Sequence, residues 1–351
     1  MTTPHADFRF TKPGALIAAL PAVLGFVPEK SLVLVSLEQG QMGAVMRADL
    51  AEDLIDNVGR VAELAATSGA DTVVIVIVDA DGALCPVCDV EHRRLCDSLS
   101  AALAERHINV SAAHVVDRVE AGGSWRCVDG CGAGGAVEDP GASPLAAAAV
   151  LDGRRLYPRR ADLQAVIAIV DTAKSAALVE PIRARAAARR ADWDKDPDGC
   201  GRRDVQTAMA VAARVREGGR PADSELAELA CALTDVAVRD TLYALAVGVD
   251  AGAAESLWAV LVQSLPEPWR VEALVLLAFS AYTRGDGPLA GLALDAALRI
   301  DPHHRMAGML DTALQSGMHP AQIRELAATG YRLAKRLGVC LPPRRAFGRA
   351  G

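Results

Sequence analysis

Aromatic residues are scarce in this sequence. Phe, Trp and Tyr make up 4% of the 351 residues, whereas hydrophobic residues as a whole make up 51%. We therefore expect cores built from Ala, Val and Leu, in which helices pack closely instead of surrounding large aromatic side chains. The chain is also too long for one ordinary core and suits two domains of ordinary size.

Long uncharged apolar runs are missing as well. None reaches the roughly 18 residues that a membrane span needs. The apolar stretch 14–27 contains Pro21, follows no basic segment and ends in a polar turn, which is not the pattern of a secretory signal. Eight Cys in this length make no disulfide framework, so we expect a cytoplasmic protein with reduced thiols.

Positive charge is in the minority. The 44 Asp and Glu exceed the 37 Lys and Arg, and the net charge of −7 argues against a nucleic-acid surface over the whole chain. Residues 152–204 are the local exception, with twelve Lys and Arg against nine Asp and Glu. Such clusters indicate either a solvated, salt-bridged helix face or a patch for a partner. The clusters are Arg154-Arg155, Arg159-Arg160, Arg183, Arg185, Arg189-Arg190 and Arg202-Arg203.

The first 142 residues alternate between strand and helix patterns. Apolar and β-branched runs predict strands at 31–37, 44–50, 72–78, 110–119 and 125–127. Helical spacing predicts helices at 51–68, where Gly69 stops the helix, and at 91–107. Thr72–Val78 is apolar on both faces, as a central covered strand should be. This order predicts an α/β domain with a mixed sheet in three layers.

From residue 143 onward the pattern is helical. The Gly- and Pro-rich segment 130–144 predicts a loop, and Ala-rich helical segments then continue to Leu337. We expect an α/β domain at 1–142, a helical connector with the basic clusters at 143–203, an all-α domain at 204–341 and a frayed basic tail at 342–351.

One stretch of the helical part has the spacing of a tetratricopeptide helix pair, with Gly285-Asp286 as the turn. Shifting by the repeat length does not reproduce the pattern, so we predict one such hairpin and no array. It can be a concave peptide-binding surface or a plain packed helical hairpin. The residues at these positions are Leu274, Leu277, Ala278, Ala281, Ala290, Leu294, Ala297 and Pro302.

A series of short motifs in a fixed order resembles the actinobacterial domain-of-unknown-function family 4192. The resemblance covers most of the chain and implies a cytoplasmic protein of unassigned activity. The family often has paired Cys at the Cys131 position, whereas Gly132 follows here. The motifs are Pro21, Gly25-Phe26, Pro28, Ser31-Leu32-Val33, Arg47, Asp49-Leu50, Trp125-Arg126-Cys127, Cys131, 145–160, Val238-Arg239-Asp240, Gly285-Asp286-Gly287 and Asp301-Pro302.

Four cysteines occur as two short pairs, Cys85-Pro-Val-Cys88 and Cys127-Val-Asp-Gly-Cys131. Zinc takes four soft ligands in a tetrahedron, and a short Cys-to-Cys turn presents two thiolates on one side. The two pairs together therefore predict a structural zinc site. Reduced, partly buried thiols are the alternative, and a redox pair at Cys85 and Cys88 is a third interpretation.

Acidic residues follow the predicted strands. Asp79 and Asp81 come directly after Thr72–Val78, and Asp49 and Asp117 fall near the ends of neighbouring strands. Ligand sites of α/β sheets lie at the carboxyl ends of strands, where carboxylates can hold Mg²⁺. Asp residues also form turns without any further role.

Two classes of function are consistent with these patterns. The first is a regulatory or protein-interaction protein, with a small-ligand site on the α/β domain and a partner docked on the helical half. The alternative is a metal-assisted hydrolase or nucleotide-handling enzyme at the carboxyl edge of the sheet. The helical hairpin pattern, and the lack of a catalytic motif such as Gly-x-Ser-x-Gly, favour the first.

Overall fold

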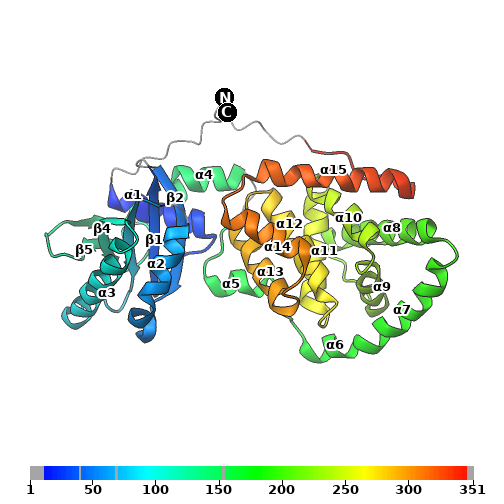
Figure 1. Ribbon diagram of the computed structural model, residues 1–351, viewed down its shortest axis with the longest axis horizontal. Coiled ribbons are helices and arrows are strands. Elements are labelled where there is room, and N and C mark those ends of the chain that lie inside the picture. Colours follow the sequence, from blue (N-terminus) through cyan, green and yellow to red (C-terminus); the bar gives the residue numbers. More distant parts are fainter. Residues whose placement is uncertain (1–11, 39–40, 68–69, 152–154, 346–351) are drawn as a thin grey trace. The chain divides into compact units, whose positions relative to one another are not determined.

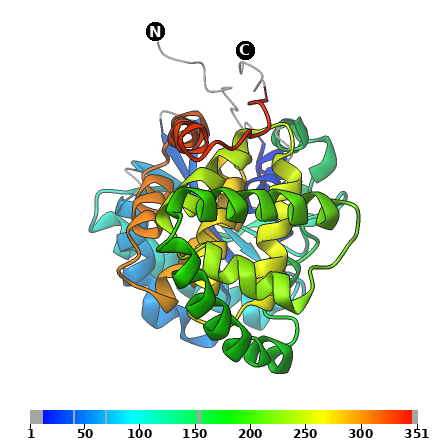
Figure 2. The same ribbon diagram turned by 90° about the vertical axis from the view of Figure 1, so that its right-hand side faces the viewer.

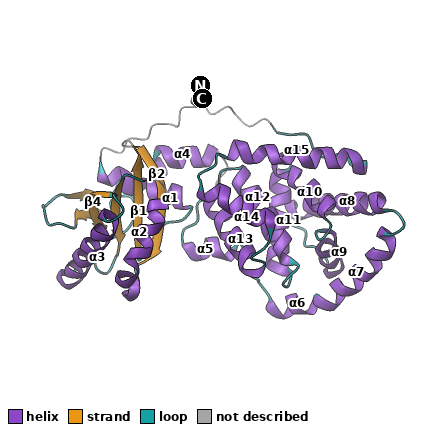
Figure 3. Ribbon diagram, viewed as in Figure 1, coloured by secondary structure: helices purple, strands orange, loops and turns teal. Residues whose placement is uncertain are grey.

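The computed structural model describes residues 12–38, 41–67, 70–151 and 155–345 (Figure 1). They form two compact units, one ending at Asp162 and the other beginning at Leu163. The first unit holds a mixed sheet with helices, and the named elements of the second are all helices (Figure 3). The predicted succession of an α/β part and a helical part is therefore confirmed. Residues 39–40, Gly69, Arg154 and the tail 346–351 lie outside the described residues.

The described part of the first unit begins with a helix and then follows the predicted order of strands and helices. Its strands are β1 (Ser31–Glu38), β2 (Gln41–Asp49), β3 (Thr72–Val78), β4 (Asn109–Val116), β5 (Ser124–Cys127) and β6 (Gly134–Ala136). Its helices are α1 (Pro13–Leu24), α2 (Val58–Thr67), α3 (Pro86–Ala104) and α4 (Pro144–Leu151), with a further short helix α5 (Arg160–Ala165) at the boundary between the units. Short 3₁₀ turns occupy η1 (Glu52–Asn57) and η2 (Pro140–Ala142).

The six strands form one sheet in the order β2-β1-β3-β4-β5-β6. β3 and β4 are parallel, because α3 crosses over between them, and the other neighbouring pairs are antiparallel. β3 is central, and six of its seven residues are buried, as its Val- and Ile-rich sequence predicts.

Helices cover both faces of this sheet. On one face, alternate strand residues such as Leu34, Ile75 and Val115 share a core with residues of α2 and α3. On the other face, Val33, Val76 and their neighbours are equally buried. That face carries α1, whose residues are mostly buried and which packs on α4 (Figure 1). The packing of α4 on α1 explains why the compact unit continues beyond residue 142, where we expect the α/β domain to end.

Two local predictions in this unit are wrong. The second predicted helix starts at Glu91 in the sequence pattern, whereas α3 begins at Pro86, because proline at the first helical position is favourable and Cys85 takes the N-cap. The predicted loop 130–144 contains β6, which pairs with β5. The three residues of β6, Gly134-Gly135-Ala136, show no alternation of apolar and polar side chains, so the sequence shows no sign of a strand there.

The second unit is built from helices and one 3₁₀ turn. They are α6 (Thr172–Ala177), α7 (Val179–Trp193), α8 (Pro197–Arg216), α9 (Asp223–Ala232), α10 (Val236–Leu242), η3 (Tyr243–Val247), α11 (Ala251–Ser264), α12 (Arg270–Thr283), α13 (Gly287–Ile300), α14 (Arg305–Gln315) and α15 (Pro320–Leu337). α8 packs against α11, α10 and α15, and α7 packs against α9 (Figure 2).

α12 is the central helix of the second unit. It packs on α11, α13 and α15, and nearly all of its residues are buried, as expected for a helix that is apolar on every side. Two aromatic residues meet here, with Phe279 and Tyr243 in edge-to-face contact at 4.8 Å between ring centroids. The likeness of α12 and α13 to a tetratricopeptide unit stays a prediction. None of the described helices is long and apolar enough to cross a membrane.

Gly330 allows a close helix contact in the second unit. A Cβ at this position of α15 would lie 2.8 Å from each of Ala244 Cβ, Asp240 O and Thr241 O. We expect Gly330→Ala to destabilise the protein by about 1–3 kcal/mol through overpacking, measured by urea denaturation followed by circular dichroism.

The matched control is Gly308→Ala in α14, where no atom lies within 4 Å of the added Cβ. This variant should gain about 0.5–1 kcal/mol from helix propensity. Equal effects of the two substitutions would contradict the close packing of α15.

Candidate functional site

The carboxyl ends of three strands meet at one edge of the sheet. β2 and β3 both run antiparallel to β1, and Ser31 of β1 pairs with Asp49 on one side and with Val78 on the other. β4 runs parallel to β3, with Val116 beside Val78. The acidic residues that follow these strands therefore lie along the same edge.

Three of these carboxylates have basic partners. Asp49 pairs with Arg47 at 2.6 Å and with Arg160 at 3.0 Å. Asp81 pairs with Lys30 at 3.0 Å. Asp117 pairs with the Arg118 guanidinium at 2.9 Å and accepts hydrogen bonds from two backbone N–H groups.

The fourth carboxylate, Asp79, is directed into the unit. Its side chain accepts a hydrogen bond from His92 Nε2 at 3.1 Å, and both side chains are largely buried. Within the described residues, no three of the four carboxylates bring oxygen atoms within 4.8 Å of one another. Their arrangement is that of separate local pairs along one edge.

The Asp79–His92 contact joins the end of β3 to α3. A tight turn connects the two, in which Asp79 O accepts from Ala83 N and Gly82 O accepts from Cys85 N. A Cβ on Gly82 would lie 2.0 Å from Asp79 Oδ2 and 3.1 Å from Cys88 Cβ, so those two atoms lie within about 5 Å of one another. Only glycine allows this approach.

The turn places Cys85 and Cys88 in the first turn of α3. Cys85 is the N-cap residue, Pro86 is the first helical residue, and both thiols are half-buried. Backbone N–H groups at a helix start are free to stabilise a negative charge. The Cys-Pro-Val-Cys segment thus presents two sulfur atoms at the positive end of a helix.

The two thiols differ in acidity. The pKa of Cys85 is lowered by the backbone N–H of Cys88, by the Cys88 thiol and by the backbone N–H of Val87. The pKa of Cys88 is raised by its contact with Cys85, by burial and by the nearby charges of Cys85 and Asp79. Cys85 is therefore the more acidic of the pair and the better nucleophile near neutral pH.

Exposed apolar side chains surround this dithiol. Leu84 is 88% exposed, Val87 69% and Val90 56%. A soluble domain usually buries such side chains or uses them for contact with a partner. We refer to Leu84, Val87 and Val90 as the apolar rim.

The second cysteine pair lies in the turn between β5 and β6. Ligand atoms of Cys127, Asp129 and Cys131 lie within 4.8 Å of one another. The pKa of Asp129 is lowered to about 2 by the Cys127 thiol, the Cys131 N–H and the Cys131 thiol. Burial, followed by the Asp129 contact, raises the pKa of Cys127 to about 11.

The sheet separates the two pairs. Arg126 of β5 reaches α3, where its guanidinium pairs with Asp89 at 2.6 Å. Cys127, the next residue, points to the opposite face and lies beside His114 of β4. The four cysteines that we group for zinc from the sequence thus form two separate pairs, each close only to its own partner.

Sequence reasoning missed three residues of these sites. Asp129 was visible between Cys127 and Cys131, as a third ligand in a Cys-x-Asp-x-Cys spacing. His92 is four residues after Cys88 and therefore on the same side of α3. The position of His114 beside Cys127 depends on the register between β4 and β5, for which the sequence carries no direct signal.

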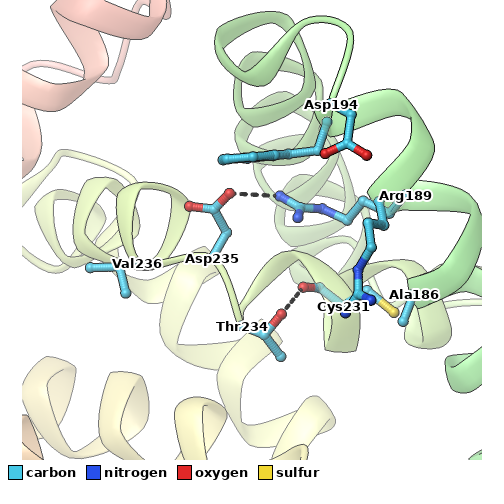
Figure 4. Close-up of a pocket in the computed structure, with 9 residues that line it drawn as sticks. Ala186, Arg189, Asp194, Cys231, Thr234, Asp235 and Val236 are labelled. Carbon is cyan, nitrogen blue, oxygen red and sulfur yellow. Dashed lines mark hydrogen bonds and ion pairs between the residues drawn. The ribbon is translucent and has the colours of Figure 1, made fainter.

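The helical unit holds a cavity of about 480 Å³ between α7, α9 and α10. Arg189 extends into it and pairs with Asp235 at 2.9 Å and with Asp204 at 2.7 Å; Figure 4 shows the Asp235 contact. Two carboxylates thus already neutralise this guanidinium, and the arrangement is that of a structural ion-pair network. It also accounts for part of the basic cluster at 152–204 as salt bridges within the fold.

Comparison with known proteins places the chain in a single family. A family model described as a domain of unknown function (DUF4192) matches residues 13–321. No curated protein matches the chain, and no solved structure does.

Arg189 should be a main support of the helical unit. Arg189→Ala leaves Asp204, whose side chain is 4% exposed, without its cation. We expect a loss of about 3–5 kcal/mol of unfolding free energy, measured by urea denaturation. Arg183→Ala on the same helix removes only an exposed pair with Glu180 and should change stability by less than about 1 kcal/mol. Similar losses in both variants would refute the buried network.

Cys85 should be the most reactive thiol among the described cysteines. At pH 7 we expect iodoacetamide to modify Cys85 at least about twofold faster than Cys340, because a lower pKa leaves more thiolate. Peptide mass spectrometry over time gives each rate. Cys340 is the control because it is solvent-exposed, so access does not limit its rate. A Cys85 rate at or below that of Cys340 would rule out the acidic N-cap thiol.

Proposed function

The chain belongs to the DUF4192 family, and we propose that Cys85 and Cys88 form a redox-active dithiol that exchanges with a disulfide of a partner protein. The observation that carries this proposal is the placement of both sulfur atoms in the first turn of α3, surrounded by the apolar rim. This makes the protein a thiol-based regulator or oxidoreductase in a reducing, cytoplasmic setting.

Cys85 is the attacking residue. Its thiolate attacks one sulfur of the partner disulfide, forms a mixed disulfide and expels the other partner sulfur as a thiolate. The half-buried side chain is accessible, and the backbone N–H groups of Val87 and Cys88 favour the thiolate at this position. These groups raise the share of Cys85 that is present as the reactive thiolate.

Cys88 is the resolving residue. After losing its proton it attacks the Cys85 sulfur, breaks the mixed disulfide and releases the second partner thiolate. The Asp79 carboxylate, within about 5 Å of Cys88 Cβ, is the group placed to accept this proton. In total, the dithiol is oxidised to one disulfide, the partner disulfide is reduced to two thiols, and the two protons pass to those thiols.

The spacing of the pair suits a reversible disulfide. Residues three apart at a helix surface have Cβ atoms roughly 5–6 Å apart, slightly more than the about 3.5–4.5 Å of a disulfide. Cys85 is an N-cap with extended backbone, so it can move toward Cys88 without unwinding α3. A small adjustment of one residue closes the bond.

The partner in this proposal is a protein. Leu84, Val87 and Val90 offer apolar contact around the sulfur atoms, which suits an extended chain better than a small polar molecule. Docking of a further partner on the helical half, including the tetratricopeptide-like pair α12 and α13, stays part of the proposal. Nucleic acid is not a proposed partner, because the net charge of the chain is −7.

The geometry gives less support to metal-assisted hydrolysis at the carboxyl edge. Asp49, Asp81 and Asp117 each have a basic partner within 3.0 Å. A metal ion there would have to displace Arg and Lys side chains from its ligands.

The direct test is a redox titration of the purified full chain. Equilibration in glutathione buffers of graded ratio, acid quenching and peptide mass spectrometry should reveal a Cys85–Cys88 disulfide. We expect a midpoint potential between about −270 and −120 mV, the range of Cys-x-x-Cys proteins.

Two variants control this experiment. Cys85→Ser should abolish the disulfide and leave the remaining thiols reduced. The double variant Cys127→Ser with Cys131→Ser should keep the same midpoint, because that pair lies on the other face of the sheet. The proposal fails if Cys85 and Cys88 stay reduced in the most oxidising buffer.

A further inference from the structure

We propose a second site on the opposite face of the sheet: Cys127, Asp129, Cys131 and His114 bind one thiophilic divalent cation, Zn²⁺ in the cell. This site is independent of the dithiol. It replaces the four-cysteine set expected from the sequence with ligands from a single hairpin and its neighbouring strand.

Three of the ligands come from one turn. β5 ends at Cys127, and the turn that leads to β6 contains Gly130 and Gly132. Their φ angles are positive, at 75° and 81° respectively. Cys127 N donates to Ala133 O, and Cys131 N donates to Asp129 Oδ1 at 3.0 Å, which closes the turn. The turn therefore holds two sulfur atoms and a carboxylate together before any ion is bound.

The distances within this set suit a tetrahedral ion. Zinc-bound sulfur atoms, at about 2.3 Å from the metal, lie about 3.8 Å apart at tetrahedral angles. The ligand atoms of Cys127, Asp129 and Cys131 are already within 4.8 Å of one another. The contraction needed among these three is small, and Cys131 and Asp129 are exposed. No nitrogen of His114 belongs to this 4.8 Å set, so the exposed turn has to move toward His114 to complete the site.

His114 is the independent observation that points to a fourth ligand. It pairs directly with Cys127 in the sheet register, so both side chains are on the same face. Its Nδ1 atom is buried and has no hydrogen-bond partner among the described residues. A buried imidazole nitrogen without a partner is destabilising, and a metal ion is one of the few partners that satisfies it.

The surroundings of His114 hold its ring in place. The ring packs edge-on against Trp125, with 5.0 Å between centroids, which fixes its plane. An oriented imidazole is a common zinc ligand.

Metal binding at this site displaces the protons of its two thiols. Without an ion, the Cys127 and Cys131 thiols face the Asp129 carboxylate, which their contacts hold ionised. One Zn²⁺ binds both sulfur atoms as thiolates and releases their two protons to solvent. Affinity must therefore rise with pH, because protons and the metal ion compete for the two sulfur atoms.

The site is separate from the dithiol in chemistry as well as in position. Zinc bound at the β5–β6 turn would leave Cys85 and Cys88 free on the α3 face. A structural ion at this hairpin fixes β5, whose Arg126 donates to Ala83 O in the turn before Cys85 at 2.9 Å.

The test is metal titration of the demetallated full chain. Competition with a chromophoric chelator should give one Zn²⁺ per chain, with tighter binding at higher pH. Co²⁺ in place of Zn²⁺ should give a thiolate-to-cobalt charge-transfer band and intense d–d bands typical of tetrahedral geometry.

Cys131→Ser is the informative variant, because Cys131 is exposed and its loss leaves the core untouched. It should weaken Zn²⁺ binding by about 100-fold or more, and His114→Gln should weaken it by about 10-fold or more. Circular dichroism of each variant verifies the fold.

Cys85→Ser with Cys88→Ser is the matched control and should bind Zn²⁺ like the unmodified chain. Loss of binding in this control would overturn the proposed ligand set in favour of a site that includes the α3 cysteines. An unmodified chain that takes up less than about 0.1 Zn²⁺, or a Cys131→Ser variant with full affinity, would also overturn it.

Discussion

The buried hydrogen bond between Asp79 and His92 is the contact on which the N-terminal unit's chemistry depends. It ties α3 to the end of the central strand β3 at 3.1 Å, and the close turn at Gly82 brings Cys88 beside the same carboxylate. With α3 held there, its first turn presents Cys85 to solvent at the positive end of the helix dipole. A buried hydrogen bond of this kind is costly to break, so it fixes one position of the helix.

The sheet explains why one chain carries two sulfur sites instead of one. Side chains alternate between the faces of β5, so Arg126 reaches α3 while Cys127 lies with His114 on the α1 side. A four-cysteine zinc site would require thiolates from both faces to meet around one ion. We therefore propose redox chemistry on the α3 face and metal binding at the hairpin. The two proposals can therefore succeed or fail separately.

The sequence predicted the features that depend on composition and periodicity. Thr72–Val78 matches β3 from end to end, because a central strand needs apolar residues on both faces. The start of α3 at Pro86 could not be predicted from periodicity, since the apolar residues Val87 and Val90 of its first turns are exposed and do not follow the buried face of the helix. The register between two strands cannot be read from a single sequence. The pairing of His114 with Cys127 could therefore not be predicted. The high arginine content, by contrast, finds a structural explanation in buried ion pairs such as Arg189 with Asp204.

The central claim is that the position of α3 makes Cys85 acidic, and the pH profile of Cys85 alkylation tests it in two variants of one residue. Asp79→Asn keeps a hydrogen-bond acceptor for His92 and should leave the Cys85 profile unchanged. Asp79→Ala removes the contact, so the first turn of α3 loses its anchor and the profile should move to higher pH, toward that of an ordinary exposed thiol. An Asp79→Ala protein that is folded by circular dichroism and has the original Cys85 profile would contradict the account.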